Sequence, residues 1–195
     1  NPTGGVTPKA EIDALVAGLQ DHPHVALMSD EIYSQMLYGG REHVSLLQYP
    51  EIRDRLIVLD GWSKTYAMTG WRLGYAVWPD QLVEQVTRLC INDHSCVNAA
   101  TQFAGIAALN GPQDFIQKNK AIFQGRRDLV VSMLNQAQGI ECPTPEGAFY
   151  VYPSVAGMIG KKAPSGKAIE NDQDFVTELL EEEGVAAVHG EPFGL

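Results

Sequence analysis

The first eighty residues alternate between helical periodicity and short apolar runs. Apolar residues recur on one helix face over residues 12–19, and Thr7 followed by Pro8 is typical of a helix start. Three short apolar runs closed by polar or turn residues then predict buried strands. These runs span residues 25–28, 56–59 and 73–78. Buried strands that alternate with helices favour an α/β sandwich whose sheet is mostly parallel.

Helical spacing dominates the second half of the chain. It predicts helices over residues 82–90 and 103–110, and a last helix over residues 175–180 that Gly184 ends. Over residues 113–138, apolar pairs recur every seven residues. This repeat predicts one long helix, or two nearly collinear ones, whose apolar stripe packs in a core.

Shorter signals complete the pattern. Apolar runs predict strands over residues 148–152 and 185–188. Residues 153–174 lack periodicity and contain Gly, Pro, Ser and three lysines, so we expect an exposed excursion on a second, smaller domain.

Composition narrows the class of protein. The 195 residues are 45% hydrophobic and 19% charged, which is typical of a folded core rather than of disorder. A net charge of −10 without a basic tract argues against a nucleic-acid partner. No apolar run approaches the roughly 18 residues of a membrane helix, and no charged-then-apolar signal stands at the start. Three cysteines without a C-x-x-C pair favour a reduced, cytoplasmic protein, with a secretory one still open.

Polar residues cluster at the ends of the predicted strands. Asp30 and Tyr33 follow the first strand, Ser63 and Lys64 follow the second, and Arg72 precedes the third. Ligands of open α/β sheets gather beyond the carboxyl ends of the strands, so these side chains are candidates for one site. Taken singly, each has an ordinary structural explanation, as a turn residue, a core residue, a surface lysine or an ion pair.

Five short motifs stand in a fixed order along the chain. They are Asn-Pro-Thr-Gly at 1–4, Ser-Asp-Glu-Ile-Tyr at 29–33, Ser-Lys-Thr-Tyr-Ala-Met-Thr-Gly-Trp-Arg-Leu-Gly at 63–74, Pro-Glu-Gly-Ala-Phe-Tyr at 145–150 and Gly-Glu-Pro-Phe-Gly at 190–194. Asn1, Asp30, Lys64 and Arg72 follow one another at intervals of 29, 34 and 8 residues. In content, order and spacing the motifs resemble those of class I and II aminotransferases, nearest to their aspartate-aminotransferase-like branch.

The resemblance implies a fold and a cofactor. Members of this family are fold type I pyridoxal-phosphate enzymes, with a three-layer α/β large domain and a smaller α+β domain. By resemblance, residues 1–125 are part of the large, cofactor-binding domain, and residues 126–195 are part of the small C-terminal domain. The cofactor acts as an electron sink for a substrate carbanion.

The resemblance also assigns roles to individual residues. It implies that Lys64 forms the Schiff base with pyridoxal 5'-phosphate and then carries a proton between the substrate Cα and the cofactor. The Asp30 carboxylate would keep the ring nitrogen protonated. This pair would supply the chemistry of the site.

Four further residues would hold the cofactor in place. The resemblance implies that Tyr33 and Asn1 hydrogen-bond the phenolic oxygen of the ring. Arg72 would offer a forked donor to the phosphate, assisted by the Ser63 hydroxyl.

The implied activity is the exchange of an amino group between an amino acid and a 2-oxo acid, in a homodimer. A pyridoxal-phosphate lyase or synthase on the same scaffold stays open, as does a non-catalytic domain. A lysine Schiff-base enzyme without cofactor is disfavoured, because Asp30, Ser63 and Arg72 would have no role there.

The chain also departs from the family pattern. The glycine-rich phosphate loop and the ring-stacking aromatic would lie before Asn1, and the substrate-carboxylate arginine beyond Gly194. We therefore expect the 195 residues to be roughly the central half of a longer enzyme, inactive when isolated.

One histidine pair has the spacing of a metal-binding motif. His22 and His24 form an H-x-H pair beside Asp21, but no further ligands follow at metal spacing. We expect a polar loop here and no metal site.

Overall fold

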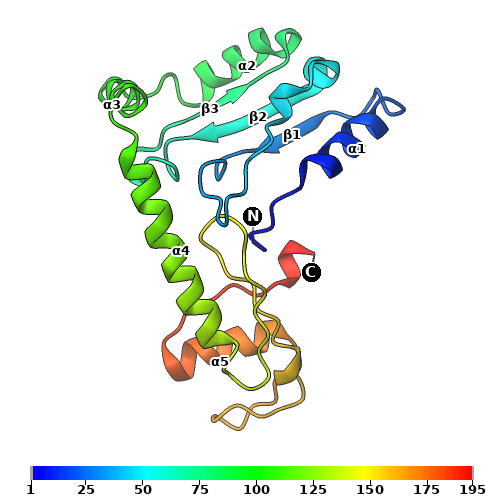
Figure 1. The fold of residues 1–195 in the computed structure, drawn as a ribbon, viewed down its shortest axis with the longest axis vertical. Helices are drawn as coiled ribbons and strands as arrows, with labels where there is room; N and C mark the ends of the chain where they lie inside the picture. Colours follow the sequence, from blue (N-terminus) through cyan, green and yellow to red (C-terminus); the bar gives the residue numbers. More distant parts are fainter. Residues whose placement is uncertain (1, 195) are drawn as a thin grey trace. The chain divides into compact units, whose positions relative to one another are not determined.

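The computed structural model describes residues 2–194, which form a mixture of helices and short strands (Figure 1). The helices are α1 (Lys9–Leu19), α2 (Asp80–Asp93), α3 (Ala99–Asn110), α4 (Asp114–Leu134) and α5 (Asp172–Glu183). The strands are β1 (Leu27–Asp30), β2 (Leu56–Gly61) and β3 (Gly74–Val77). Short 3₁₀ turns are η1 (Leu46–Gln48), η2 (Pro50–Arg55), η3 (Thr69–Trp71), η4 (Ala156–Met158) and η5 (Glu191–Phe193). The predicted α/β class is confirmed.

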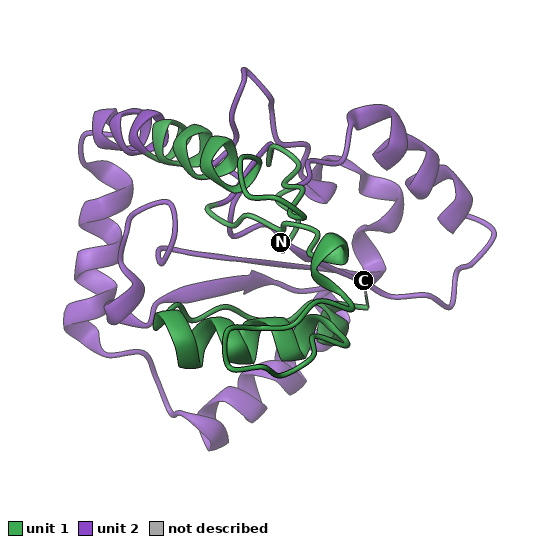
Figure 2. Ribbon diagram, turned by 90° about the horizontal axis from the view of Figure 1, so that it is seen from below, with its two compact units in different colours: residues 1–4, 123–145, 149–195 green, residues 5–122, 146–148 purple. Residues whose placement is uncertain are grey.

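The described chain divides into two compact units (Figure 2). Unit 2, drawn purple, consists of residues 5–122 and 146–148 and contains all three strands. Unit 1, drawn green, comprises the rest of the described chain, with α5 and the later part of α4.

The three strands form one mixed sheet in the order β1-β2-β3. β1 runs parallel to β2, with Leu27 opposite Leu56, whereas β3 runs antiparallel to β2, with Gly61 opposite Gly74. Parallel neighbours need a long crossover connection, and the turn over residues 62–73 contains no crossover helix. β3 therefore folds back, and the described sheet has one pairing of each kind where the sequence predicts mostly parallel ones.

A hydrophobic core fills one face of this sheet. Leu56 and Val58 point to the same side of β2 because side chains alternate along a strand. Ile12 and Val16, one turn apart on α1, pack against them, and Ile52 from η2 completes the layer. This core fixes β2, the strand that pairs with both of its neighbours.

Helix ends follow the predicted signals closely. Pro8, rather than Thr7, is the N-cap of α1, since its backbone is extended and Lys9 is the first helical residue. Gly184 ends α5 in the left-handed conformation, with φ 67°, as predicted. The predicted region 113–138 contains a single continuous helix, α4, which ends at Leu134, four residues before the end of the region.

Three predictions do not hold within the described residues. The apolar stripe of α4 is not packed in a core there, because Ile122 is 51% exposed and Leu129 is 60% exposed. No strand forms over residues 148–152, where Ala148 has a left-handed φ of 57° that breaks an extended run. Residues 185–188 have no strand partner in the described chain either.

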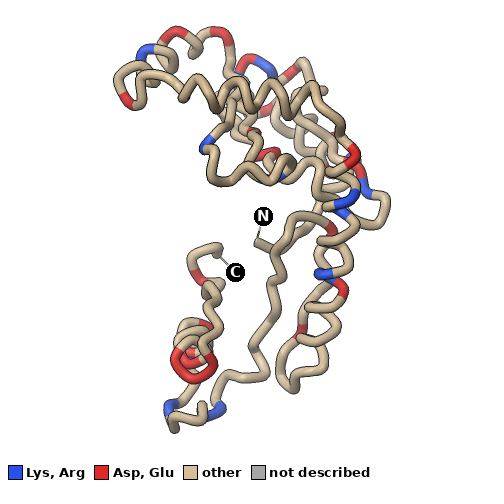
Figure 3. The backbone as a smooth tube through the Cα atoms, turned by 90° about the vertical axis from the view of Figure 1, so that its left-hand side faces the viewer, with Lys and Arg blue, Asp and Glu red and all other residues tan. Residues whose placement is uncertain are grey.

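Acidic residues cluster on one helix, α5, of the unit formed by residues 1–4, 123–145 and 149–195. Acidic residues follow one another along α5 (Figure 3). Lys167 of the predicted excursion reaches this helix, with Nζ 3.1 Å from an Asp174 oxygen and 3.6 Å from a Glu178 oxygen. The basic segment is thus held against an acidic helix within one unit. Within residues 2–194, no helix combines the length and hydropathy that a membrane span requires.

Removing side-chain volume at Ile52 should destabilise the protein. Ile52 is 0% exposed, so Ile52→Ala creates a cavity in the core beneath β2 and should lower the free energy of unfolding by about 2–5 kcal/mol. Denaturant unfolding of the natural-length protein measures this loss. Leu15→Ala, on the exposed side of α1, is the matched control and should cost less than about 1 kcal/mol. Equal losses would contradict the described core.

Candidate functional site

Strand register brings two separate segments to one edge of the sheet. Asp30 ends β1 opposite Leu59, and β2 then continues to Gly61. Gly61 lies opposite Gly74, where β3 begins. The turn after β1 and the turn over residues 62–73 therefore leave the sheet at the same edge, which is where α/β sheets bind ligands.

The first segment is the turn that follows β1. The exposed Asp30 carboxylate accepts a hydrogen bond from the backbone N–H of Ile32, with Oδ1 and N 3.2 Å apart. Tyr33 is buried, and its carbonyl accepts a bond from the N–H of Met36. The turn therefore places the Asp30 carboxylate at the sheet edge and buries the Tyr33 side chain.

The second segment carries Ser63 and Lys64, which are both half-buried. Lys64 Nζ lies 5.8 Å from the centroid of the Tyr33 ring. An ammonium at this distance from an aromatic face is attracted by the ring quadrupole. The fold thus brings together two of the predicted site residues, Tyr33 and Lys64, which come from different motifs.

Trp62 anchors this segment. Its backbone carbonyl accepts bonds from the N–H groups of Tyr66 and Met68, at 3.2 and 3.3 Å. Its indole Nε1 donates to the Gly105 carbonyl of α3 at 3.1 Å, and Ala67 adopts a left-handed φ of 52°. The turn that carries Lys64 is closed by these bonds, so the lysine stem starts from a fixed backbone.

Arg72, another predicted site residue, lies near the end of the same turn. It follows η3 in the left-handed conformation, with φ 53°, and its Nη1 donates to the Thr69 carbonyl at 3.0 Å. The guanidinium is exposed, and four of its five donors remain for an anion beyond the bond to Thr69. Asn1, the remaining predicted site residue, lies outside the described residues.

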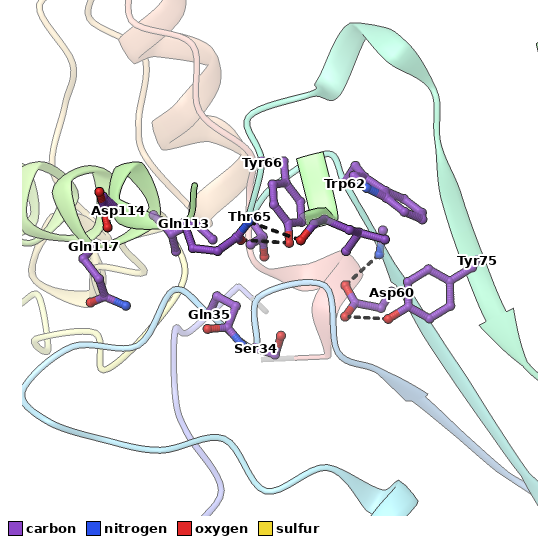
Figure 4. Close-up of a pocket in the computed structure, with 13 residues that line it drawn as sticks. Ser34, Gln35, Asp60, Trp62, Thr65, Tyr66, Tyr75, Gln113, Asp114 and Gln117 are labelled. Carbon is purple, nitrogen blue, oxygen red and sulfur yellow. Dashed lines mark hydrogen bonds between the residues drawn. The ribbon is translucent and has the colours of Figure 1, made fainter. Parts of the chain in front are cut away.

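A pocket of about 460 Å³ lies beside these segments (Figure 4). Its lining includes Ser34, next to Tyr33 in the chain, and Thr65, next to Lys64. The Tyr66 hydroxyl donates to Gln113 Oε1 at 3.2 Å across its rim. Asp30, Lys64 and Arg72 are not among the lining residues, so the pocket adjoins the predicted site without containing it.

Asp60, which the sequence interpretation did not select, lies in this pocket. Its carboxylate accepts bonds from the N–H of Gly61 at 2.6 Å and from the Tyr75 hydroxyl at 3.4 Å. Burial is the strongest influence and raises the pKa of Asp60 above its ordinary value, against the lowering effect of both bonds. The sequence signal was an acidic residue directly after a predicted buried strand.

Glu31 is a second acidic residue that the sequence interpretation missed. Its buried carboxylate accepts bonds from His43 Nε2 at 2.9 Å and from the Leu46 N–H at 3.1 Å. Burial would raise the pKa of Glu31, but hydrogen bonds, led by that from His43, outweigh it and lower the pKa. Its place between Asp30 and Tyr33 in one motif was the available signal.

The histidine pair considered for metal binding forms only an aromatic contact. The rings of His22 and His24 meet edge to face, with centroids 6.0 Å apart. Within residues 2–194, no group of three His, Cys, Asp or Glu residues is arranged to hold a metal ion.

The comparison with protein families agrees with this geometry. The model of the family "Aminotransferase class I and II" matches residues 1–195, and the chain belongs to this family. The resemblance carried by the five motifs is therefore confirmed.

Individual relatives cover the whole chain. It is 54% identical to the probable aspartate/prephenate aminotransferase of Rhizobium leguminosarum bv. phaseoli and 45% identical to the aspartate/prephenate aminotransferase of Cereibacter sphaeroides. Each alignment covers 100% of this chain and 49% of the relative. The chain thus spans about half the length of the curated relatives it matches.

Solved structures show the same fold. The aspartate aminotransferase of Rhizobium meliloti superposes with a TM-score of 0.95 at 44% identity, over 100% of this chain and 49% of that one. An aromatic aminotransferase of Pyrococcus horikoshii gives a TM-score of 0.85 at 29% identity, over 100% and 50%. The predicted fold class is confirmed by these superpositions.

The close approach at Gly61 predicts a sharp glycine dependence. A Cβ at Gly61 would lie 2.9 Å from both Gly74 Cα and the Leu73 carbonyl oxygen, which belong to the paired backbone. Gly61→Ala should therefore lower the free energy of unfolding by about 1–3 kcal/mol, measured with denaturant on the natural-length protein. Gly70→Ala in the same turn meets nothing within 4 Å and is the matched control. A neutral Gly61→Ala would rule out this register.

Proposed function

We propose that the protein, at its natural length, is a pyridoxal-phosphate-dependent aminotransferase. The observation that carries the proposal is the convergence of two of the five motifs, at 29–33 and 63–74, at one sheet edge, with Lys64 Nζ 5.8 Å from the Tyr33 ring. Family membership supports the same reaction class. The chain described here contains about half of such an enzyme.

The donor set at this edge fits the cofactor chemically. A carboxylate at Asp30 suits a protonated ring nitrogen, and an amine at Lys64 suits an aldehyde. The exposed guanidinium of Arg72 and the hydroxyl of Ser63 suit a phosphate dianion. When bound, pyridoxal phosphate supplies an aldehyde carbon and an electron sink.

Lys64 is the proposed catalytic residue. Its Nζ would hold the cofactor aldehyde before substrate arrives and then move a proton between the substrate Cα and the cofactor. Hydrogen bonds to the Trp62 carbonyl fix the backbone of the turn that carries Lys64. The lysine side chain therefore extends from a defined position toward a bound substrate. A positioned acid–base group contributes about 10²–10⁴-fold to rate.

The remaining residues bind and orient. Asp30 would keep a proton on the ring nitrogen, because an ionised carboxylate favours a neighbouring cation. Tyr33, together with Asn1, would hydrogen-bond the phenolic oxygen. Arg72 and Ser63 would fix the phosphate, which sets the ring plane relative to Lys64.

The substrates are an amino acid and a 2-oxo acid. Relatives at 54% and 45% identity are named aspartate/prephenate aminotransferases, so aspartate is the first amino donor to assay. These names favour transamination over a lyase or synthase reaction on the same scaffold. We further propose a cytoplasmic homodimer, with the boundary between large and small domains near residue 125.

Replacing the proposed catalytic lysine should abolish transfer. Lys64→Ala should lower kcat for aspartate and a 2-oxo acid about a thousandfold, because it removes the proposed proton-transferring amine. The visible absorbance of bound cofactor should change at the same time. Lys118→Ala, an exposed lysine of α4, is the matched control and should retain full activity. Normal turnover by Lys64→Ala would refute the proposal.

Replacing Asp30 should separate binding from turnover. Asp30→Ala removes the proposed counter-charge of the ring nitrogen but leaves Lys64 intact, so the cofactor band should persist while kcat falls about a hundredfold. Absorbance and steady-state kinetics on the same preparation measure both effects. Asp21→Ala, an exposed acid in the loop before β1, should behave as wild type. An unchanged kcat in Asp30→Ala would show that Asp30 has another role.

A further inference from the structure

Glu31 is an unusual residue for the middle of a surface turn. It is only 6% exposed, although its neighbour Asp30 is exposed. Burying a carboxylate is costly unless hydrogen bonds replace the lost water. The buried Glu31 carboxylate must therefore be stabilised by hydrogen bonds from neighbouring groups.

Several donors surround the Glu31 carboxylate, and a hydrogen bond with the Ser45 side chain is among those that lower its pKa. His43 Nε2 lies 2.9 Å from Oε2, while the Leu46 N–H and the Ser29 hydroxyl lie 3.1 Å from Oε1. An ionised carboxylate only accepts hydrogen bonds, so His43 Nε2 carries the hydrogen in this contact. Both carboxylate oxygens are thus used, and the turn after β1 is tied to the separate loop over residues 43–46.

The Glu31 backbone is fixed as well. Its N–H donates to the Leu59 carbonyl at 2.8 Å, which extends the pairing of β1 with β2 by one bond. Its carbonyl accepts from the Ser34 N–H at 2.9 Å, and this bond closes the turn that contains Tyr33. Main chain and side chain together hold Glu31 in place, directly between Asp30 and Tyr33.

We propose that Glu31 and His43 are positioning residues that hold Asp30 and Tyr33 where the cofactor ring is bound. Asp30 itself has one local bond, to the Ile32 N–H, so its orientation depends on the turn that Glu31 anchors. Loss of the His43 contact leaves one carboxylate oxygen of Glu31 without its donor, and the turn can shift. This inference rests on the proposed function, because it concerns the placement of two proposed cofactor ligands.

The test compares two substitutions of His43 in the natural-length protein. His43→Ala removes the donor, whereas the side-chain amide of His43→Gln places an N–H near the position of Nε2. His43→Ala should weaken pyridoxal-phosphate binding about tenfold, measured by absorbance titration of the apoprotein, and His43→Gln should bind it as tightly as wild type does. Among cofactor-loaded molecules, kcat should fall in His43→Ala while KM for the amino acid stays unchanged.

Controls separate positioning from stability. His22→Ala removes an exposed histidine in the loop before β1 and should bind the cofactor as wild type does. A residue that only stabilises the fold would lower the melting temperature without changing cofactor affinity in the folded protein. Wild-type affinity in folded His43→Ala would therefore overturn the inference.

Two further outcomes keep the tests distinct. If wild type itself binds no pyridoxal phosphate, the proposed function fails and the positioning role fails with it; if wild type binds and His43→Ala binds equally, only the positioning role fails. If His43→Ala does not fold, Ser29→Ala removes a second donor to Glu31 and should weaken binding about threefold. Unchanged affinity in Ser29→Ala would then overturn the inference.

Discussion

The backbone pairing around β2 is the constraint on which the candidate site depends. β2 pairs in parallel with β1 and antiparallel with β3. The backbone at Gly74 lies so close to Gly61 that a Cβ at Gly61 would clash with it. Because of this register, residues separated by about thirty positions leave the sheet at one edge. Lys64 can lie beside Tyr33 only while that pairing persists.

Two acids close to the site are affected in opposite ways by their surroundings. Hydrogen bonds, led by that from His43, lower the pKa of the buried Glu31, whereas burial raises the pKa of the half-buried Asp60, near the end of β2. Hydrogen bonds therefore stabilise the charged form of Glu31, whereas burial destabilises the charged form of Asp60. Glu31 and Asp60 both lie within a few residues of proposed cofactor ligands, so a shift of the backbone at either acid would displace those ligands.

Much of this could be predicted from the sequence, and the failures have physical reasons. Strand ends and the motif order located Asp30, Tyr33 and Lys64, because turn and strand signals are local. The direction of β3 depends on the short connection over residues 62–73, which contains no α-helix and which periodicity does not reveal. The apolar spacing of α4 predicts a stripe packed in a core, but spacing alone does not show which residues pack against a helix. Glu31 was missed because burial of a single acid depends on the distant donors His43 and Leu46. The roles of the site residues remain predictions.

The most direct test is chemical labelling of the lysine. The natural-length protein is incubated with pyridoxal phosphate, reduced with borohydride, digested and analysed by mass spectrometry. The account predicts that the phosphopyridoxyl mass is found on the peptide that contains Lys64. A label confined to another lysine, or no label above that of a denatured control, would contradict it.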